Sequence, residues 1–394
     1  MKKQIKDVIS AEFKGLWGTD FSDDGIPVIK TNNMTYEGRI DYSDICLRNI
    51  TSEEAEENFL CNGDLIIEKS GGTKTHSVGY VNIFEGEDNK YVCNNFILPI
   101  RPNRDLVNPK YLFWQLHGMY EAGRFSDCFN KTTGIQNLQK KTYFSKEINV
   151  PTLPEQQKIA AHLDSIQSAI DNKKQQLVQL DELVKSKFVE MFGENPVESG
   201  KWKVETLGSK SELITKGASP RWQGVEYQSE GTLFVTSENV REGYVDLTKS
   251  KYLPDEINEI LPRSILKKND VLINIVGASI GRAAIYEFEQ KANINQAVAL
   301  VRLNSSDLDK TFLLIYLNSE LAMKLYQSMI KGGARDNLSL KNISDLSIPV
   351  PPIELQNTFA EYVQKIDSAK SIIKTQLEDL QELLDSKMDE YFGE

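Results

Sequence analysis

The sequence lacks the features of several large classes of protein. No apolar run approaches the roughly 18–20 residues that a membrane span needs, and the N-terminus carries Lys2 and Lys3 without an apolar segment behind them. The four cysteines form no CxxC pair, so neither a disulfide framework nor a zinc site is indicated; they are Cys46, Cys61, Cys93 and Cys128. We therefore expect a cytoplasmic protein that binds no metal.

Catalytic signatures are also missing. The three histidines, His76, His117 and His162, do not have the spacing of metal ligands. The sequence contains no Asn-Pro-Pro-Tyr or Asp-Pro-Pro-Tyr motif, no GxGxxG loop and no P-loop. We therefore expect a protein that is not an enzyme and needs no cofactor.

The chain is acidic, with a formal net charge of -11 over 394 residues. This charge argues against an indiscriminate nucleic-acid binder, because contacts to phosphate favour a basic protein. The acidity is densest in residues 350–394, and the longer segments can still present basic surfaces. The length allows two to four domains, each with its own core.

An internal repeat sets the architecture. At a shift of 200 residues, Val150 matches Val350, Gln156 matches Gln356, and residues 188–194 match 388–394. The shift drifts to 201 at Arg101 and Arg302, and to 206 at Asp64 and Asp270, as loops of different length would produce. The chain therefore consists of two tandem copies of a unit, divergent at its start and similar at its end.

Each copy begins with a segment of mixed α and β pattern. Short apolar runs at 64–67 and 271–275, punctuated by Gly, Asn and Pro, are typical of strands. Helices are expected at about 108–121 and 309–330. Asp64 and Asp270 stand just before strand runs, where capping of a turn is expected rather than catalysis.

A long helical segment closes each copy, after a cluster of prolines that favours a helix start. Its apolar seam is Ile159, Leu163, Ile166, Ile170, Lys173, Leu177, Leu180, Val184, Lys187 and Met191 in the first copy, and Phe359, Val363, Ile366, Lys370, Ile373, Leu377, Leu380, Leu384, Lys387 and Tyr391 in the second. A heptad pattern of this length predicts a coiled coil, and the repeat symmetry predicts that the helices run antiparallel. The alternative is that they are core helices of two ordinary domains.

This organisation resembles the specificity subunits of Type I restriction-modification enzymes. Residues 148–157 and 348–356, the two Phe-Gly-Glu helix ends, and 64–79 with 270–281 carry the resemblance, which covers essentially the whole chain. It implies an α+β fold of two mixed α/β target-recognition domains in tandem, each followed by a long helix, with the two helices forming an antiparallel coiled coil. The implied boundaries are 1–150 and 195–349 for the domains, and 151–194 and 350–394 for the helices.

The resemblance also implies a function and partners. A specificity subunit reads a bipartite, interrupted site in double-stranded DNA, one half per domain. It binds two modification subunits, which methylate adenine at N6, and restriction subunits, which translocate and cut DNA using ATP. Two other functions fit the same pattern: the recognition subunit of a related restriction system that cuts on both sides of its site, and a protein-interaction scaffold without a DNA role.

Candidate DNA-contacting residues lie on polar loops that contain glycine. Phosphates are bound by Lys, Arg and backbone amides, and base edges by Arg, Asn, Gln or Ser/Thr; the alternative is an ordinary solvated turn. The candidates in the first copy are Lys69, Gly71, Gly72, Thr73, Lys74, Thr75, Lys131, Gln136, Asn137, Lys140 and Lys141. Those in the second copy are Lys216, Arg221, Ser279, Arg282, Lys331, Arg335, Asn337 and Lys341.

Overall fold

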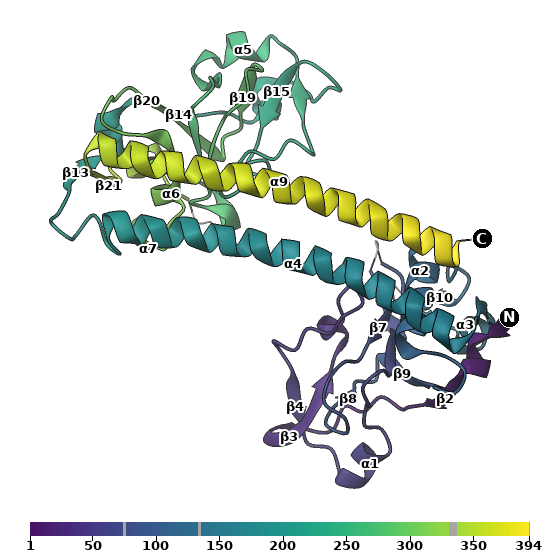
Figure 1. The fold of residues 1–394 in the computed structure, drawn as a ribbon. Helices are drawn as coiled ribbons and strands as arrows, with labels where there is room; N and C mark the ends of the chain where they lie inside the picture. Colours follow the sequence, from purple (N-terminus) through teal and green to yellow (C-terminus); the bar gives the residue numbers. More distant parts are fainter. Residues whose placement is uncertain (74–75, 133–134, 331–336, 394) are drawn as a thin grey trace. The chain divides into compact units, whose positions relative to one another are not determined.

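The computed structural model describes residues 1–394 except 74–75, 133–134, 331–336 and 394 (Figure 1). The chain forms two compact units, Met1–Lys174 with Thr375–Glu394 and Gln175–Lys374. Each unit therefore contains one domain together with part of both long helices.

Unit 1 contains the first domain. Its elements are β1 (Lys2–Gln4), η1 (Ile5–Val8), β2 (Ile9–Glu12), β3 (Phe21–Ile29), η2 (Thr31–Asn33), β4 (Cys46–Arg48), α1 (Ser52–Glu56), β5 (Leu65–Glu68), β6 (Ser70–Gly71), β7 (Val81–Ile83), β8 (Val92–Cys93), β9 (Ile97–Pro102), α2 (Pro109–Glu121), β10 (Phe129–Thr132), β11 (Ile135–Leu138), α3 (Lys140–Ser145) and β12 (Glu147–Asn149).

Unit 2 contains the second domain. Its elements are β13 (Lys203–Thr206), η3 (Leu207–Lys210), β14 (Ser211–Lys216), η4 (Pro220–Gln223), β15 (Thr232–Val235), β16 (Tyr252–Leu253), α5 (Ile257–Ile260), η5 (Pro262–Ser264), β17 (Val271–Asn274), η6 (Gly277–Ser279), β18 (Ala283–Ile285), β19 (Ala292–Ile294), β20 (Val298–Leu303), α6 (Lys310–Leu317), α7 (Glu320–Met329), α8 (Leu340–Ser344) and β21 (Ser347–Val350).

The two domains share their sheet topology. A four-stranded sheet has the order β2-β9-β5-β7 in the first domain and β14-β20-β17-β18 in the second. A three-stranded sheet has the order β4-β3-β8 and β16-β15-β19, with one parallel pair in each. Pairing of β1 with β12, and of β13 with β21, joins the start of each domain to its end. The repeat seen in the sequence is therefore a repeat of structure.

A buried aspartate pairs with a half-buried arginine at the same place in both domains. Asp64 is 1% exposed, accepts a hydrogen bond from the backbone N–H of Cys61 at 2.8 Å, and receives the guanidinium of Arg101 at 2.8 and 2.7 Å. Asp270 does the same with Lys267 and Arg302. The turn-capping role expected for both aspartates is confirmed, and the matching arginines of the repeat are their ion-pair partners.

The expected helix at 309–330 was wrong in one respect, because it is two helices. Asn318 ends α6, and its side chain accepts from the backbone N–H of Ala283 and donates to the carbonyl of the same residue. Ser319 then caps the N-terminus of α7. The asparagine side chain bonds to strand β18, so the chain turns between the two helices.

The long helices are α4 (Leu153–Phe192) and α9 (Ile353–Phe392), each of 40 residues. Each start is anchored by a fully buried glutamine. Gln156 accepts from the backbone N–H of Asn108 and donates to two carbonyls, and Gln356 repeats this with Asp309. Within the described part of the chain, no helix is long and apolar enough to cross a membrane.

The helices pair as an antiparallel coiled coil, which confirms the heptad prediction. In unit 1, the first part of α4 packs against the last part of α9, with Leu163 and Ile166 in one core with Leu384. In unit 2, the last part of α4 packs against the first part of α9, with Phe188 in one core with Phe359 (Figure 1). Every seam position predicted from the sequence is buried or half-buried.

Candidate nucleic-acid interface

In the first domain, strand pairing joins two candidate segments that are distant in the sequence. After β5 the chain forms β6, which pairs with β11 in the register Gly71 to Gln136 and Ser70 to Asn137. Strand β10 pairs with the other edge of β11 and places Lys131 opposite Gln136. The structure thus brings the stretch that begins at Lys69 beside the stretch that ends at Lys141.

Side chains below this loop hold its backbone. Gln136 is 8% exposed; its amide donates to the carbonyl of Thr73 and accepts from the N–H of Val78, each at 3.2 Å. Glu68 accepts from the N–H of Gly72 at 3.2 Å, and burial raises the pKa of its carboxyl. The φ angle of Gly71 is 130°, and a Cβ there would lie 2.6 Å from Glu68 Oε1. Gln136 and the two glycines therefore shape the loop.

Lysines gather around one carboxylate beside the loop. Lys140 pairs with Glu12, and these residues line a hollow together with Lys6 and Lys141. Burial, and then the charge of Lys140, lower the pKa of Lys69. The cluster keeps a net positive charge, which suits phosphate. Lys6 escaped the sequence analysis because it comes from the start of the chain.

An aromatic stack stands next to the loop and was also missed. The ring of Tyr36 stacks on His76 with centroids 3.8 Å apart, and Tyr80 follows at 5.1 Å. Tyr120 continues the group and donates to the carbonyl of Ser77. Tyr36 and His76 are 40 positions apart in the sequence, so only the fold reveals the pair.

The second domain brings its candidates together by another route. Val276 bridges to Asn337, and the N–H of Leu338 donates to the carbonyl of Ile275 at 2.9 Å, as that of Leu138 does to Lys69. Asn274 is fully buried and donates to Ser279 Oγ at 3.1 Å. The helix η6 therefore lies beside the strand-like segment at 337.

Three cations of the second domain are available for a ligand. Lys216, Arg221 and Arg282 are exposed, and their side chains form no hydrogen bond or ion pair with any residue that the structure describes. A Cβ at Gly217 would lie 1.6 Å from the carbonyl oxygen of Ile294, so the glycine allows the two backbone segments to approach this closely. Lys341 is exposed on α8 and pairs with Asp345 at 2.6 Å.

Some candidates cannot be placed. Lys74, Thr75, Lys331 and Arg335 lie outside the described residues, and for Lys131 only the backbone position in β10 is described. Asn137 is exposed, and its Oδ1 accepts from Ser70 at 2.8 Å.

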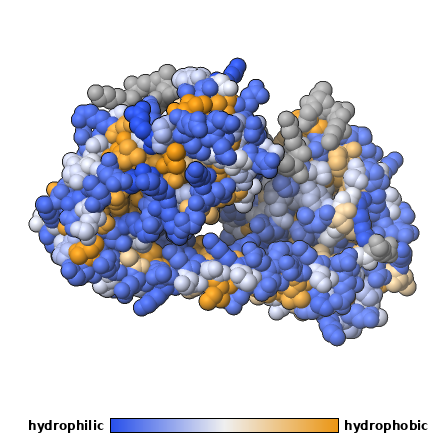
Figure 2. Space-filling model, turned by 90° about the horizontal axis from the view of Figure 1, so that it is seen from above, coloured by the Kyte–Doolittle hydropathy of each residue, from blue (hydrophilic) through white to orange (hydrophobic). Residues whose placement is uncertain are grey.

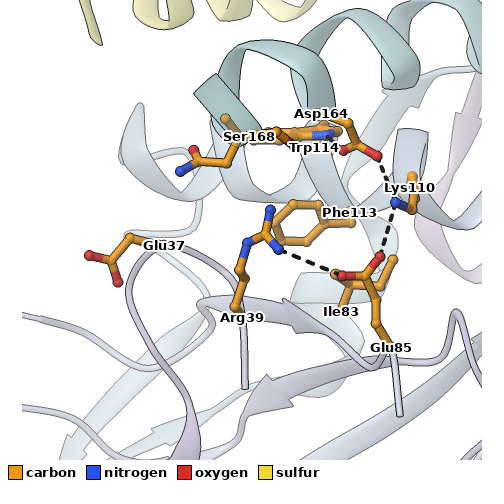
Figure 3. A pocket seen from close by; sticks show the side chains of 10 residues that line it. Glu37, Arg39, Ile83, Glu85, Lys110, Phe113, Trp114, Asp164 and Ser168 are labelled. Carbon is orange, nitrogen blue, oxygen red and sulfur yellow. Dashed lines mark hydrogen bonds and ion pairs between the residues drawn. The ribbon is translucent and has the colours of Figure 1, made fainter. Parts of the chain in front are cut away.

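The small pocket shown in Figure 3 lies in unit 1, between the domain and α4. Lys110 bridges Glu85 at 2.9 Å and Asp164 at 2.7 Å, and Trp114 donates to Asp164 at 2.8 Å. Arg39 contacts Glu85 and lies 3.3 Å from Asp171. These ion pairs link the first domain to α4, because Lys110 and Arg39 lie in the domain whereas Asp164 and Asp171 lie on the helix. Among the described residues, no group of His, Cys, Asp and Glu could hold a metal ion.

Comparison with known proteins identifies the repeat. The family model described as "Type I restriction modification DNA specificity domain" matches residues 1–182 and again 200–382. The specificity subunit of the Type I restriction enzyme EcoBI from Escherichia coli is 25% identical over 309 residues, which cover 73% of this chain and 64% of that protein. That of the Type I restriction enzyme MjaVIII from Methanocaldococcus jannaschii is 23% identical, covering 76% of this chain and 72% of that protein.

Solved structures share the fold. The S subunit of a Type I restriction-modification system from M. genitalium superposes with a TM-score of 0.57 at 17% identity, covering 100% of this chain and 96% of that one. A chain from a study of complex assembly and conformational transition of the type I R-M system gives 0.58 at 16% identity, covering 100% and 97%.

Proposed function

Because the chain belongs to the Type I restriction-modification DNA specificity family, we propose that it reads a bipartite, interrupted site in double-stranded DNA, one half with each domain. The observation that carries this proposal is that the two domains share their sheets and their Asp–Arg pair but differ in the loops. We call the shared sheets and ion pair the frame. The same sheets and the same Asp–Arg pair support a strand pair in one domain and η6 in the other. Two domains that read different half-sites need such an arrangement.

The candidate residues fall into groups with different roles, according to their exposure and their chemistry. The exposed cations Lys141, Lys216, Arg221, Arg282 and Lys341 suit phosphate oxygens, which fix position but carry no sequence information. Asn137, Ser279 and Asn337 have groups that read base edges. Gln136, Gly71 and Gly72 act through the loop backbone. Lys69 and Lys140 belong to the basic cluster around Glu12.

The proposal includes partners and excludes catalysis by this chain. Two modification subunits would methylate adenine in each half-site, and restriction subunits would translocate and cut the DNA. This chain supplies sequence recognition only. The four segments 1–150, 151–194, 195–349 and 350–394 would then be reader, spacer helix, reader and spacer helix.

A gel-shift competition tests the proposal. Labelled duplex that carries the site found by methylome sequencing is mixed with the chain and its modification subunit, and bulk DNA is added as competitor. A specific DNA reader keeps the labelled site bound in an excess of bulk DNA, whereas a scaffold without a DNA role gives no shift of the labelled duplex. Cleavage on both sides of the site by the assembled system would instead identify the related restriction class.

A further inference from the structure

Each domain has a turn that leads into a central strand of its four-stranded sheet. Residues 94–96 precede β9 in the first domain, and residues 295–297 precede β20 in the second. We call these two segments the entry turns. Strand β9 is antiparallel to its neighbours β2 and β5, and β20 is antiparallel to β14 and β17. Each entry turn therefore stands between the two loops that leave the neighbouring strands.

The backbone of both entry turns is held by the same hydrogen bonds. The side chain of Asn94 accepts from the N–H of Phe96 at 3.1 Å. In the second domain, the side chain of Asn295 accepts from the N–H of Ala297 at 3.1 Å. The carbonyl of Phe96 accepts from the N–H that follows β5 at 2.8 Å, and the carbonyl of Ala297 from the N–H that follows β17 at 2.9 Å. The turn is thus joined to the loop that carries candidate DNA-contacting residues.

The loop that leaves the other neighbouring strand also touches the entry turn. A Cβ at Gly15 would lie 2.2 Å from a carbonyl oxygen of the first entry turn, and a Cβ at Gly217 would lie 2.9 Å from one of the second. An exposed lysine precedes each of these glycines, Lys14 in the first domain and Lys216 in the second. Loops with cations therefore meet at the entry turn from both sides.

The two entry turns differ in the side chain that they present. Phe96 is 51% exposed, and Ala297 stands in its place in the second domain. Because the second domain builds the same turn with a methyl group, the turn does not need the phenyl ring. Figure 2 shows apolar residues in small separate groups on a mainly hydrophilic surface. An isolated exposed ring is ordinary on such a surface, but this one lies where the polar loops of the first domain meet.

An apolar ring can read one group on the edges of the bases. In the major groove, the C5-methyl group of thymine is the apolar feature, and phenylalanine is among the side chains that contact it. The neighbouring Lys14 suits a phosphate oxygen, which would hold the duplex against the loops.

We propose that Phe96 is a specificity-determining residue, whose ring contacts the methyl group of one thymine in the half-site that the first domain reads. This inference rests on the proposed function and adds the residue and the chemical group that it recognises.

Deoxyuridine tests the contact, because it lacks only the methyl group of thymidine and keeps every hydrogen-bonding group. A half-site in which adenine is methylated contains at least one thymine, on the opposite strand. Each thymine of the half-site is replaced in turn, and the affinity of the full-length chain with its modification subunit is measured by fluorescence anisotropy. For the wild-type chain, one replacement should weaken binding about fourfold, as expected for one buried carbon group.

The Phe96→Ala variant should lose this response. Its affinity for the thymine duplex should fall at least about fourfold, and the deoxyuridine replacement should then have no further effect. Methylome sequencing should show that the variant accepts other base pairs at that one position and leaves the second half-site unchanged. The melting temperature should stay the same, because Ala297 occupies the equivalent turn.

The chain offers a matched control at the other end of a sheet. Phe288 is 37% exposed and follows β18, whose last residue pairs with the first residue of β17. Phe288→Ala should leave the recognised site and the response to deoxyuridine unchanged. A wild-type chain that responds to no replacement, or a Phe96→Ala variant that keeps the wild-type response, would overturn the inference. A loss in Phe96→Ala that is equal on all duplexes would overturn it as well.

The same measurements separate this inference from the proposed function. A wild-type chain that does not discriminate its site from bulk DNA would contradict the proposed function. A wild-type chain that discriminates its site, with Phe96→Ala discriminating equally well, would contradict only the role given to Phe96.

Discussion

The two domains have the same structure around their buried aspartates and different structures in the loops that follow β5 and β17. The buried Asp64–Arg101 and Asp270–Arg302 pairs have the same geometry within 0.1 Å. Immediately after β5 the first domain forms a strand that pairs with β11, whereas after β17 the second forms η6. The frame and the loop are thus separate parts, and the loop can change without the frame.

One buried position differs between the two domains together with the loop that follows it. Glu68 and Asn274 occupy the same place in the repeat, at the end of β5 and β17. The carboxylate of Glu68 accepts from the N–H of Gly72, whereas the amide of Asn274 donates to Ser237, Val240 and Ser279. An acceptor contacts one loop and a donor contacts the other, so the buried residue at this position differs together with its loop.

Exchange of a whole domain should have the largest effect. Replacing residues 1–150 with the same region of a relative should change one half of the recognised site completely and leave the other half intact, because each reader has its own frame. Methylome sequencing of a host with the hybrid and its modification subunit measures both halves. A change in both halves would show that the domains do not read independently.

Removal of the guanidinium that pairs with the buried aspartate should destabilise either domain. Arg101→Met leaves the carboxylate of Asp64, 1% exposed, without its ionic partner, and such a loss costs about 3–5 kcal/mol. Arg302→Met should cost at least as much, because that arginine side chain is 16% exposed against 32% for Arg101. Urea unfolding measures both.

A charge-neutral variant is the control for this effect. Asp64→Asn with Arg101→Met removes both charges and should recover part of the stability. No difference between the single and the double variant would contradict the role given to the buried charge.

The lysines at equivalent positions should behave alike. Lys141→Gln and Lys341→Gln should each weaken binding to all duplexes several-fold and lower the slope of log K against log salt by about 1, if each contacts one phosphate. Lys146→Gln is the control, because Lys146 lies outside the candidate stretches; it pairs with Asp127 at 2.7 Å, as Lys341 pairs with Asp345 at 2.6 Å. Slopes unchanged in both test variants would place the phosphate contacts elsewhere.

The smallest effect is expected at Glu68. Burial raises the pKa of its carboxyl above the usual 4.5, so the folded state holds this proton more tightly than the unfolded state. The stability contribution is therefore fully present below pH 4.5 and is lost as pH rises through the folded-state pKa. Glu68→Gln keeps an oxygen for Gly72 and does not titrate, so it should raise the melting temperature by a few degrees at pH 8 and leave it unchanged at pH 4.

Equal melting temperatures for Glu68→Gln and the wild-type chain at pH 8 would contradict the role of burial. Asn274→Asp makes the reverse change in the second domain and should lower stability as pH rises.

Much of the fold could be predicted because the sequence itself carries two patterns, the heptad spacing and the internal repeat. The heptad seam is read directly from residue spacing, and the repeat relates Asp64 to Asp270 and Arg101 to Arg302 before any contact is known. The break at Asn318 could not be predicted, because its cause is a hydrogen bond to Ala283 in another element. A pattern along the chain does not show which strand lies beside a helix end.

The sequence proposes the candidate loops as segments, but it does not show how each residue in them is placed. Gln136 and Asn137 are neighbours of similar chemistry, yet pairing with β6 buries the amide of Gln136 and leaves Asn137 exposed. The stack of Tyr36 on His76, and the place of Lys6 beside Lys141, join residues that no spacing connects. The structure thus separates residues that support the loop from those that face outward.

The order of the chain within unit 1 has a consequence for biosynthesis. Its core includes Leu384 and Phe392, so the unit is completed by residues 375–394, which follow the whole of unit 2. At roughly 5–20 residues per second, a ribosome needs about 10–40 seconds to make the intervening 200 or so residues. During that time the first domain has already left the ribosome. The seam of α4 from Leu163 to Ile170 still lacks the part of helix α9 that packs against it. The nascent chain therefore exposes an apolar stripe until residues 375–394 have been made, and during this interval it has the greatest need of chaperones.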